Sequence, residues 1–233
     1  MPGSIRLFVN APLAAGAEIA ASPGQAHYLA TVMRRAAGTI VHLFNGVDGE
    51  WQARLATLRR DRAVLTVETR LRAQTPEPDL WLAFALLKRD ATDLVVQKAT
   101  ELGVAEIIPI ITERTQAERV NSARLAAIAT EAAEQCERLT VPVLHPPRRL
   151  SALLAGWPEP RLLFVAAERS GSPGPPTTRE PTGLLVGPEG GFTEAELDAI
   201  RAHPFSVTVS LGPRILRAET ASIVGLALLQ ARG

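Results

Sequence analysis

The chain has 233 residues, a formal net charge of +1 and 46% hydrophobic residues, which is enough for a packed core and excludes an intrinsically disordered chain. Its single cysteine, Cys136, excludes an internal disulfide and a cysteine-based zinc cluster, and the four histidines lack the spacing of metal ligands. No metal site is predicted. We see no signal peptide and no membrane-spanning apolar run, so a soluble cytoplasmic protein without membrane partners is expected.

The charge is distributed unevenly along the chain. Residues 1–72 hold nine arginines, no lysine and five acidic residues, a net charge of +4, and the remainder of the chain therefore carries −3. An arginine-rich segment before an acidic one is typical of a polyanion-binding module joined to a catalytic module. An ordinary solvated surface would give the same small excess, so charge alone does not decide between these interpretations.

Residues 1–72 are predicted to form a small β-rich domain. A short helix is expected from His27 to Arg35. An antiparallel meander over 39–69 follows, because Asn-Gly and Asp-Gly turn pairs separate β-branched runs that alternate with polar residues. The stretch Ala73–Asp79 has two prolines and no periodicity, and it is the expected linker.

The rest of the chain, residues 80–233, is predicted to form a larger α/β domain. Strands are expected at 80–87, 107–111, 161–166, 184–186 and 206–209, and helices at 90–102 with Asp90 as cap, 121–139, 193–202 and 218–230. A proline-rich stretch over 170–183 is expected to be a loop. Strands that alternate with helices imply a mostly parallel sheet that helices cover on both faces.

Two glycine-bearing segments near the carboxyl end carry most of the functional information. Gly187–Phe192 (GPEGGF) and Leu211–Ala221 (LGPRILRAETA) each follow an apolar strand and lead into a helix. Their main-chain N–H and C=O groups predict a pocket for a small polar ligand. Thr193 and Glu196 have the spacing of a capping box, which would use the N–H groups that a phosphate needs. The ligand is therefore expected to be neutral or zwitterionic, and S-adenosylmethionine fits this better than a nucleoside triphosphate.

The two glycine segments together resemble the signature of the RsmE family, the ribosomal RNA (uracil-N3)-methyltransferases of the SPOUT class. Similarity extends over nearly the full length, through the blocks at 6–9, 27–34, 44–46, 97–104 and 131–138. The resemblance implies a PUA-like RNA-binding β-barrel over 1–72, a linker over 73–79 and a SPOUT methyltransferase domain over 80–233. The carboxyl-terminal part of that domain would be threaded into a trefoil knot, a rare exception among folds.

The resemblance also implies an activity. The cofactor would be S-adenosyl-L-methionine, and the target N3 of the uridine at position 1498 of 16S ribosomal RNA within the assembled small subunit, with a homodimer as the active assembly. The residues implied to bind the cofactor are Leu163, Ala167, Gly187, Glu189, Gly190, Gly191, Leu211, Gly212, Ile215, Leu216 and Ala218. The residues expected to contact RNA are Arg6, His27, Arg34 and Arg35.

The chemistry of such a reaction requires the loss of a proton, because uracil N3 is a weak nucleophile while it is protonated. Arg217 and Glu219, at the start of the last helix, are the first candidates: an arginine can stabilise the developing anion and a carboxylate can accept the proton. Arg138, with Glu134, is the second candidate. A structural ion pair, or the helix dipole acting on Glu219, would also account for these residues.

Three other functions are considered. A non-catalytic RNA-binding protein with a degenerate pocket is an alternative, and so is a methyltransferase of the same class that acts at another RNA position. A dinucleotide-dependent oxidoreductase is disfavoured, because the first strand of the α/β domain runs into Leu87–Asp90 without a glycine. The last helix has a wide apolar face around Ile223 and Leu226, which suits burial against its own sheet alone or also against a partner subunit.

Overall fold

A computed structural model describes residues 5–59, 61–116, 120–167, 172–178 and 180–231. The chain divides into two compact units, which we call the first unit (Met1–Pro76 with Ala133–Val141) and the second unit (Glu77–Ala132 with Pro142–Gly233). The first unit therefore draws on a second piece of chain, beyond the amino-terminal segment. Among the described residues, no helix combines the length and the apolar composition that crossing a bilayer requires.

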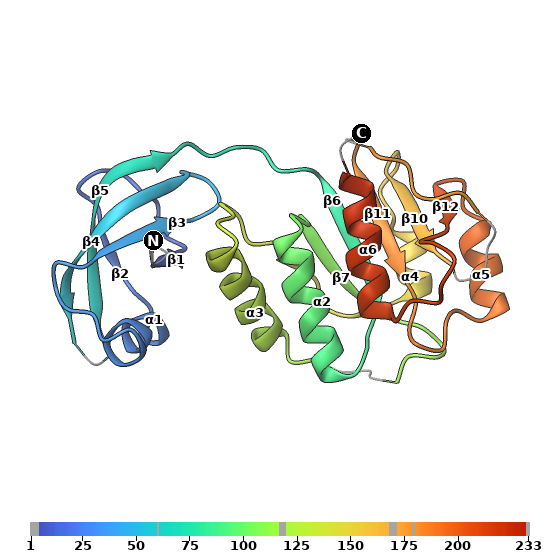
Figure 1. Cartoon of the computed structure of the whole chain (residues 1–233), viewed down its shortest axis with the longest axis horizontal. Coiled ribbons are helices and arrows are strands. Elements are labelled where there is room, and N and C mark those ends of the chain that lie inside the picture. The colour runs from blue at the N-terminus through green and yellow to red at the C-terminus, as the bar shows by residue number, and fades with distance from the viewer. Residues whose placement is uncertain (1–4, 60, 117–119, 168–171, 179, 232–233) are drawn as a thin grey trace. The chain divides into compact units, whose positions relative to one another are not determined.

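The first unit is built on a five-stranded sheet of order β1-β3-β4-β5-β2 (Figure 1). Its strands are β1 (Arg6–Phe8), β2 (Glu18–Ala20), β3 (Ile40–Phe44), β4 (Glu50–Leu58) and β5 (Ala63–Arg72). The meander β3–β4–β5 is antiparallel, as predicted, and β1 pairs with β3 in parallel. Strands β1 and β2 were not predicted from the sequence. Each has three residues, which is too short to show the alternation that identifies a strand.

The helix predicted from His27 to Arg35 lies earlier in the chain. Helix α1 (Pro23–His27) starts after Ser22, whose hydroxyl accepts the N–H of Gln25 at 3.2 Å while the Gln25 side chain accepts the N–H of Ser22 at 3.0 Å. A π-helical turn over Tyr28–Val32 completes the element. Proline and glycine have low helix propensity, so the Pro-Gly pair in the first turn argues against a helix start at this position. Proline is nevertheless favourable at the first helical position.

The side chain of Arg6 is buried in the first unit, where it forms an ion pair and packs against an aromatic ring. Its side chain is 4% exposed, and Nε donates to Oε1 of Glu50 at 2.5 Å. The second carboxylate oxygen of Glu50 accepts from Nε of Arg72 at 2.6 Å, so one carboxylate joins two guanidinium groups. The guanidinium of Arg6 also lies 4.4 Å from the centroid of the Phe44 ring. A buried charge is tolerated when it is paired and hydrogen-bonded in this way.

The same arginine ends helix α3 (Ser122–Gln135). Nη1 of Arg6 donates to the carbonyls of Ala133 and Glu134 at 2.9 Å, and Nη2 donates to the carbonyl of Arg138 at 2.7 Å. These acceptors would otherwise lack partners at the helix end, which accounts for an end at Gln135 rather than at residue 139. The prediction that Arg6 contacts RNA is wrong in this structure, because its guanidinium is buried and donates to Glu50 and to these carbonyls.

The second unit is a parallel sheet of order β12-β10-β11-β6-β7-β8, with β9 paired to β7. Every recorded pairing in it is parallel, so the predicted parallel α/β arrangement is confirmed. The strands are β6 (Leu80–Ala85), β7 (Glu106–Ile111), β8 (Val143–Leu144), β9 (Arg148–Arg149), β10 (Leu162–Ala166), β11 (Thr182–Val186) and β12 (Ser206–Val209). Strand β11 begins inside the predicted loop 170–183, of which residues 170, 171 and 179 lie outside the described residues.

Helices cover both faces of this sheet (Figure 1). On one face α2 (Arg89–Glu101) and α6 (Ala218–Gln230) contact each other, and a Cβ at Gly225 of α6 would come within 2.7 Å of the Leu184 side chain. On the other face α4 (Leu150–Ala155) and α5 (Glu194–Arg201) share one buried cluster with the sheet.

The start of α2 differs from its prediction. Lys88 occupies the N-cap position and makes no side-chain cap, so Asp90 is not the predicted cap but lies in the first turn. The Thr92 hydroxyl, which is buried, donates to the carbonyl of Leu87 at 3.0 Å and accepts its N–H at 3.2 Å. This side chain satisfies both main-chain groups of the residue that leads into the helix.

The carboxylate of Glu50 should make the first unit sensitive to acid. Burial raises the pKa of Glu50, but hydrogen bonds and charge from Arg72 and Arg6 outweigh burial and hold the pKa below its ordinary value of 4.5. A carboxyl group whose folded-state pKa is depressed contributes stability above its unfolded pKa, and that stability is lost as pH falls through the folded-state pKa. The protection of the β3 and β4 amides against exchange, taken relative to the intrinsic exchange rate at each pH, should therefore fall as pH drops below 4.5.

The variant Glu50→Gln tests this assignment. It should cost about 3 kcal/mol of stability at neutral pH, because it leaves the buried Arg6 without its counter-charge. The protection of the β3 and β4 amides against exchange should then depend less on pH. Glu18→Gln, at an exposed position of β2, is the control and should behave as the wild type. Equal acid sensitivity in the wild type and in Glu50→Gln would contradict the assignment.

Candidate functional site

Three neighbouring strands of the second unit end at the same edge of the sheet. Strand β10 lies between β11 and β12, and its last residue, Ala166, pairs with Val186 of β11 and with Val209 of β12. Because the three strands are parallel, the residues that follow them, such as Ala167 and Gly187, leave the sheet side by side. The two glycine segments, which helix α5 and strand β12 separate in the sequence, thus meet at one edge of the sheet.

The first glycine segment is shaped by two of its glycines. A Cβ at Gly187 would lie 3.0 Å from the ring of Phe192, which is itself buried in the core. Gly191 has a φ of +67°, a conformation that side chains disfavour, and its N–H donates to the carbonyl of Pro188 at 2.8 Å. A side chain at either position would distort the bend after β11.

The amino end of α5 is already occupied by its own side chains, as predicted. The hydroxyl of Thr193 accepts the N–H of Glu196 at 3.2 Å, and Oε2 of Glu196 accepts the N–H of Thr193 at 2.9 Å. The other oxygen of Glu196 accepts the N–H of Glu113 at 2.8 Å. The cap uses the N–H of Glu196, and the carboxylates of Glu194 and Glu196 in the first turn would repel a phosphate. A ligand here would therefore contact the bend before the helix.

The second glycine segment, Leu211–Ala221, begins after β12 and runs into the first turn of α6. Gly212 has a φ of +119°, and its N–H donates to the hydroxyl of Ser210 at 3.3 Å. Within the described part of the chain, no N–H group from Arg214 to Arg217 has a protein acceptor. Arg217 stands at the N-cap of α6 and provides no side-chain cap. This segment therefore presents unbonded main-chain donors that no side chain caps.

Nearly all of the predicted cofactor-binding residues lie in these bends or directly beside them. They are Ala167, Gly187, Glu189, Gly190, Gly191, Leu211, Gly212, Ile215, Leu216 and Ala218. Leu163 is the exception, since it pairs with Gly183 and Ser206 near the opposite end of β10 and is wholly buried. A cofactor contact at Leu163 is not supported, because no part of its side chain is exposed.

The first catalytic candidates are available to a substrate. Arg217 is exposed and Glu219 is half-buried, and neither side chain has a hydrogen-bond or ion-pair partner among the described residues. The structural ion pair considered as an alternative is therefore not formed between them. Arg138 is buried in the first unit, where its Nη2 donates to the hydroxyl of Thr140 at 3.0 Å.

The remaining RNA-binding candidates of the first unit are exposed. His27 ends α1, and Arg34 and Arg35 follow the π-helical turn. Arg34 has a φ of 48°, which ends the helical segment. Nδ1 of His27 lies 3.3 Å from the Thr31 hydroxyl, a contact that leaves the rest of the ring at the surface.

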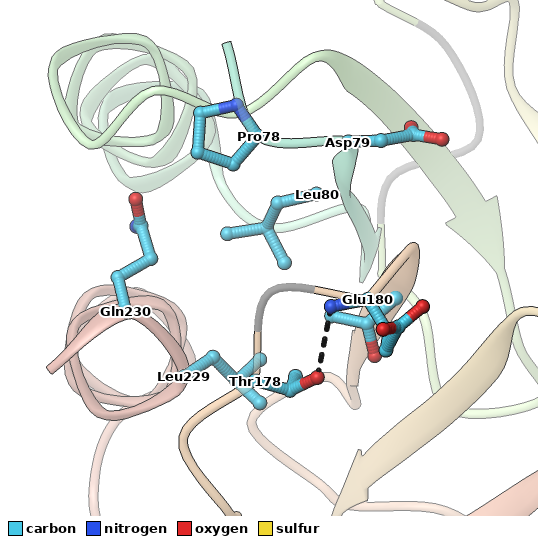
Figure 2. A pocket seen from close by; sticks show the side chains of 8 residues that line it. Pro78, Asp79, Leu80, Thr178, Glu180, Leu229 and Gln230 are labelled. Carbon is cyan, nitrogen blue, oxygen red and sulfur yellow. Dashed lines mark hydrogen bonds between the residues drawn. The ribbon is translucent and has the colours of Figure 1, made fainter. Parts of the chain in front are cut away.

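A small pocket lies at the opposite edge of the second unit's sheet (Figure 2). Its lining residues are Pro78, Asp79, Leu80, Thr178, Glu180, Thr182, Leu229 and Gln230. Leu80 and Thr182 are the first residues of β6 and β11, whereas Gly187 follows the last residue of β11. The pocket is therefore separated from the two glycine segments by the length of a strand, and we do not assign the cofactor to it.

One residue at the site was missed by the sequence analysis. Arg114 follows β7 and donates to the carbonyl of Gly190 at 2.7 Å. The signal that could have found it is its position just after a predicted parallel strand, where loops converge on one edge.

The chain matches two family models. Residues 74–230 match a model described as an RNA methyltransferase domain, and residues 22–68 match a model described as an RNA methyltransferase PUA domain. A curated relative from Rickettsia conorii, named Ribosomal RNA small subunit methyltransferase E, is 33% identical over 235 residues, with 98% of this chain and 96% of the relative covered. The chain belongs to this methyltransferase family. The resemblance of its glycine segments to the RsmE family is thereby confirmed.

Solved structures of similar proteins agree with this membership. A Ribosomal RNA small subunit methyltransferase E from Neisseria gonorrhoeae, bound to S-adenosyl methionine, is 30% identical with a TM-score of 0.87, covering 98% of this chain and 97% of that chain. A putative methyltransferase from Legionella pneumophila, in complex with the cofactor SAM, has the same identity, TM-score and coverage. The α/β fold preceded by a PUA domain is therefore that of the family.

The capping box of α5 gives a stability prediction. Thr193→Ala removes the hydroxyl that accepts the N–H of Glu196, and it should cost about 1 kcal/mol in the free energy of unfolding, measured by urea titration. Thr193→Ser keeps the hydroxyl and is the matched control, which should lose little. Equal losses in the two variants would contradict the capping role.

Proposed function

We propose that this protein uses S-adenosyl-L-methionine to methylate N3 of a uridine in 16S ribosomal RNA of the small subunit, at position 1498. The observation that carries the proposal is the pairing of Ala166 with both Val186 and Val209, which brings the two glycine segments together at one sheet edge. Family membership and the cofactor-bound relatives support the choice of ligand. The trefoil knot implied by the family resemblance belongs to this proposal.

The residues at this edge leave room for a ligand that contacts the main chain. A Cβ at Gly191 or at Gly212 would meet no atom within 4 Å, so open space borders the main chain at both bends. Ile215 is 61% exposed and offers an apolar surface beside the free N–H groups of the second glycine segment. The bound cofactor supplies a methyl group that its sulfonium charge has already activated. The protein therefore has chiefly to position and deprotonate the base.

Arg217 and Glu219 are proposed to act on the uracil ring. Removal of the N3 proton places negative charge on the ring, and a guanidinium near O2 or O4 would stabilise it. The carboxylate of Glu219 would accept the proton while the N3–C bond forms and the C–S bond of the donor breaks. Both side chains are without protein partners among the described residues, which leaves them available for these roles.

Exposed cations of the first unit are proposed to hold the RNA. His27, Arg34 and Arg35 lie at its surface, and phosphate binding sums over such contacts. A substrate within the assembled small subunit would add contacts of its own, which suits the modest basic excess of this segment. This substrate would place the enzyme in the cytoplasm.

A homodimer is also proposed, through helix α6. Leu228 of this helix is 38% exposed and Ala227 beside it is exposed, while Leu226 is buried within the second unit. The exposed part of the apolar face would be covered by a second copy.

The proposed activity is tested by binding and by mapping. Calorimetry should give saturable binding of S-adenosylmethionine to the purified full chain. Small subunits from cells that lack this protein should gain a methyl group on uracil N3 at position 1498 when incubated with protein and cofactor. Failure of the wild type to bind the cofactor, or methylation elsewhere only, would overturn the proposal.

Two variants test the assigned chemistry. Arg217→Ala and Glu219→Gln should each lower kcat by about 100-fold, because each removes a group that acts on the reacting base. Calorimetric affinity for S-adenosylmethionine should change little, since neither side chain is needed to hold the cofactor. Arg201→Ala, at the exposed end of α5, is the control and should keep full kcat. Wild-type kcat in both site variants would show that neither residue acts on the base.

A further inference from the structure

We infer that Arg114 is a positioning residue that holds the first glycine segment, Gly187–Phe192, in the shape that binds the cofactor. The inference rests on the proposed function for its ligand. Arg114 lies on the loop after β7, and β7 is separated from β11 in the sheet only by β6. Parallel pairing brings this loop to the edge where the glycine segment leaves β11.

The guanidinium of Arg114 contacts the main chain of the segment directly. Nη1 donates to the carbonyl of Gly190 at 2.7 Å and lies 3.5 Å from the carbonyl oxygen of Phe192. A charged donor makes a stronger bond to a carbonyl than a neutral one does. One planar group thus reaches two main-chain acceptors on either side of Gly191, the glycine with a left-handed φ.

The aliphatic part of Arg114 covers the other side of Gly190. A Cβ added at Gly190 would lie 3.3 Å from Cδ and 3.4 Å from Cβ of Arg114, so the arginine stem occupies the space that a side chain would need. Arg114 thus bonds to the carbonyl of Gly190 and also fills the space where a side chain at that position would lie.

The same loop also forms a hydrogen bond to the capping residue of α5. The N–H of Glu113 donates to Oε1 of Glu196 at 2.8 Å, and Glu196 is the residue that caps the helix with Thr193. The loop is itself fixed, because the hydroxyl of Thr115 accepts the N–H of Thr112 at 2.9 Å. Adjacent residues of one loop thereby hold the bend and the helix that follows it.

The glycine segment needs such a restraint because glycine has more conformational freedom than other residues. A segment with three glycines among six residues loses more entropy on ordering than other sequences do. Restraint before binding lowers the entropy lost on binding, so a held segment binds its ligand more tightly. Arg114 provides that restraint from outside the segment, without occupying the open space beside Gly191.

The experiment compares Arg114→Ala, Arg114→Lys and the control Arg201→Ala in the full chain. Calorimetry should show a Kd for S-adenosylmethionine about tenfold higher in Arg114→Ala, as expected for the loss of a charge-assisted hydrogen bond. Lysine keeps the charge and the stem but lacks the planar fork, so Arg114→Lys should fall between Arg114→Ala and the wild type. Arg201→Ala should bind as the wild type does.

A second measurement does not depend on the cofactor. Hydrogen exchange of the main-chain amides in residues 187–193, with no cofactor added, should be faster in Arg114→Ala and unchanged in Arg201→Ala. Arg114 is exposed, so the melting temperature of both Arg114 variants should stay near that of the wild type. If Arg114→Ala does not fold, Arg114→Lys decides by the same two measurements.

Two outcomes would overturn the inference. One is wild-type Kd and wild-type exchange in Arg114→Ala. The other is an unchanged Kd with a lower kcat, which would mean that Arg114 acts on the substrate rather than on the segment. Failure of the wild type to bind S-adenosylmethionine would instead overturn the proposed function, while the exchange measurement would still decide whether Arg114 braces the glycines.

Discussion

The parallel pairing of β10 with both β11 and β12 is the constraint on which the candidate site depends. Because Ala166 is in register with Val186 and Val209, the chain leaves all three strands at one edge. A hairpin arrangement of the same strands would send alternate bends to opposite edges. Sheet topology, more than any single side chain, thus assembles the site from segments that the sequence keeps apart.

The character of the site follows from what its main chain leaves unbonded. The start of α5 carries a capping box of Thr193 and Glu196, whereas α6 has no side-chain cap and the segment before it has N–H groups without protein acceptors in the described part of the chain. The start of α5 is therefore capped and acidic, and the start of α6 is left without a side-chain cap. The loop after β7 contacts both parts of this region. Arg114 donates to the glycine bend, and its neighbour Glu113 donates to the capping residue of α5.

Much of the second unit could be predicted from the sequence, because its buried strands are apolar runs and its helices have a clear period. The capping box at Thr193 was predicted from spacing alone and is present. What could not be predicted depends on contacts distant in sequence. The end of α3 is set by Arg6, more than 120 residues away, through its bonds to main-chain carbonyls. The burial of Leu163 depends on where β10 sits between its neighbours, which an isolated apolar run does not reveal.

The most direct test of this account is a titration of the isotope-labelled full chain with S-adenosylmethionine, followed through the main-chain amide signals. The account predicts that the signals of Gly187, Gly191 and Gly212 shift together and saturate at one ligand per chain. The signals of Leu80 and Thr182, at the opposite edge of the sheet, should stay in place. Shifts confined to Leu80, Thr182 and Leu229 would contradict the account, because they would place the ligand in the small pocket instead.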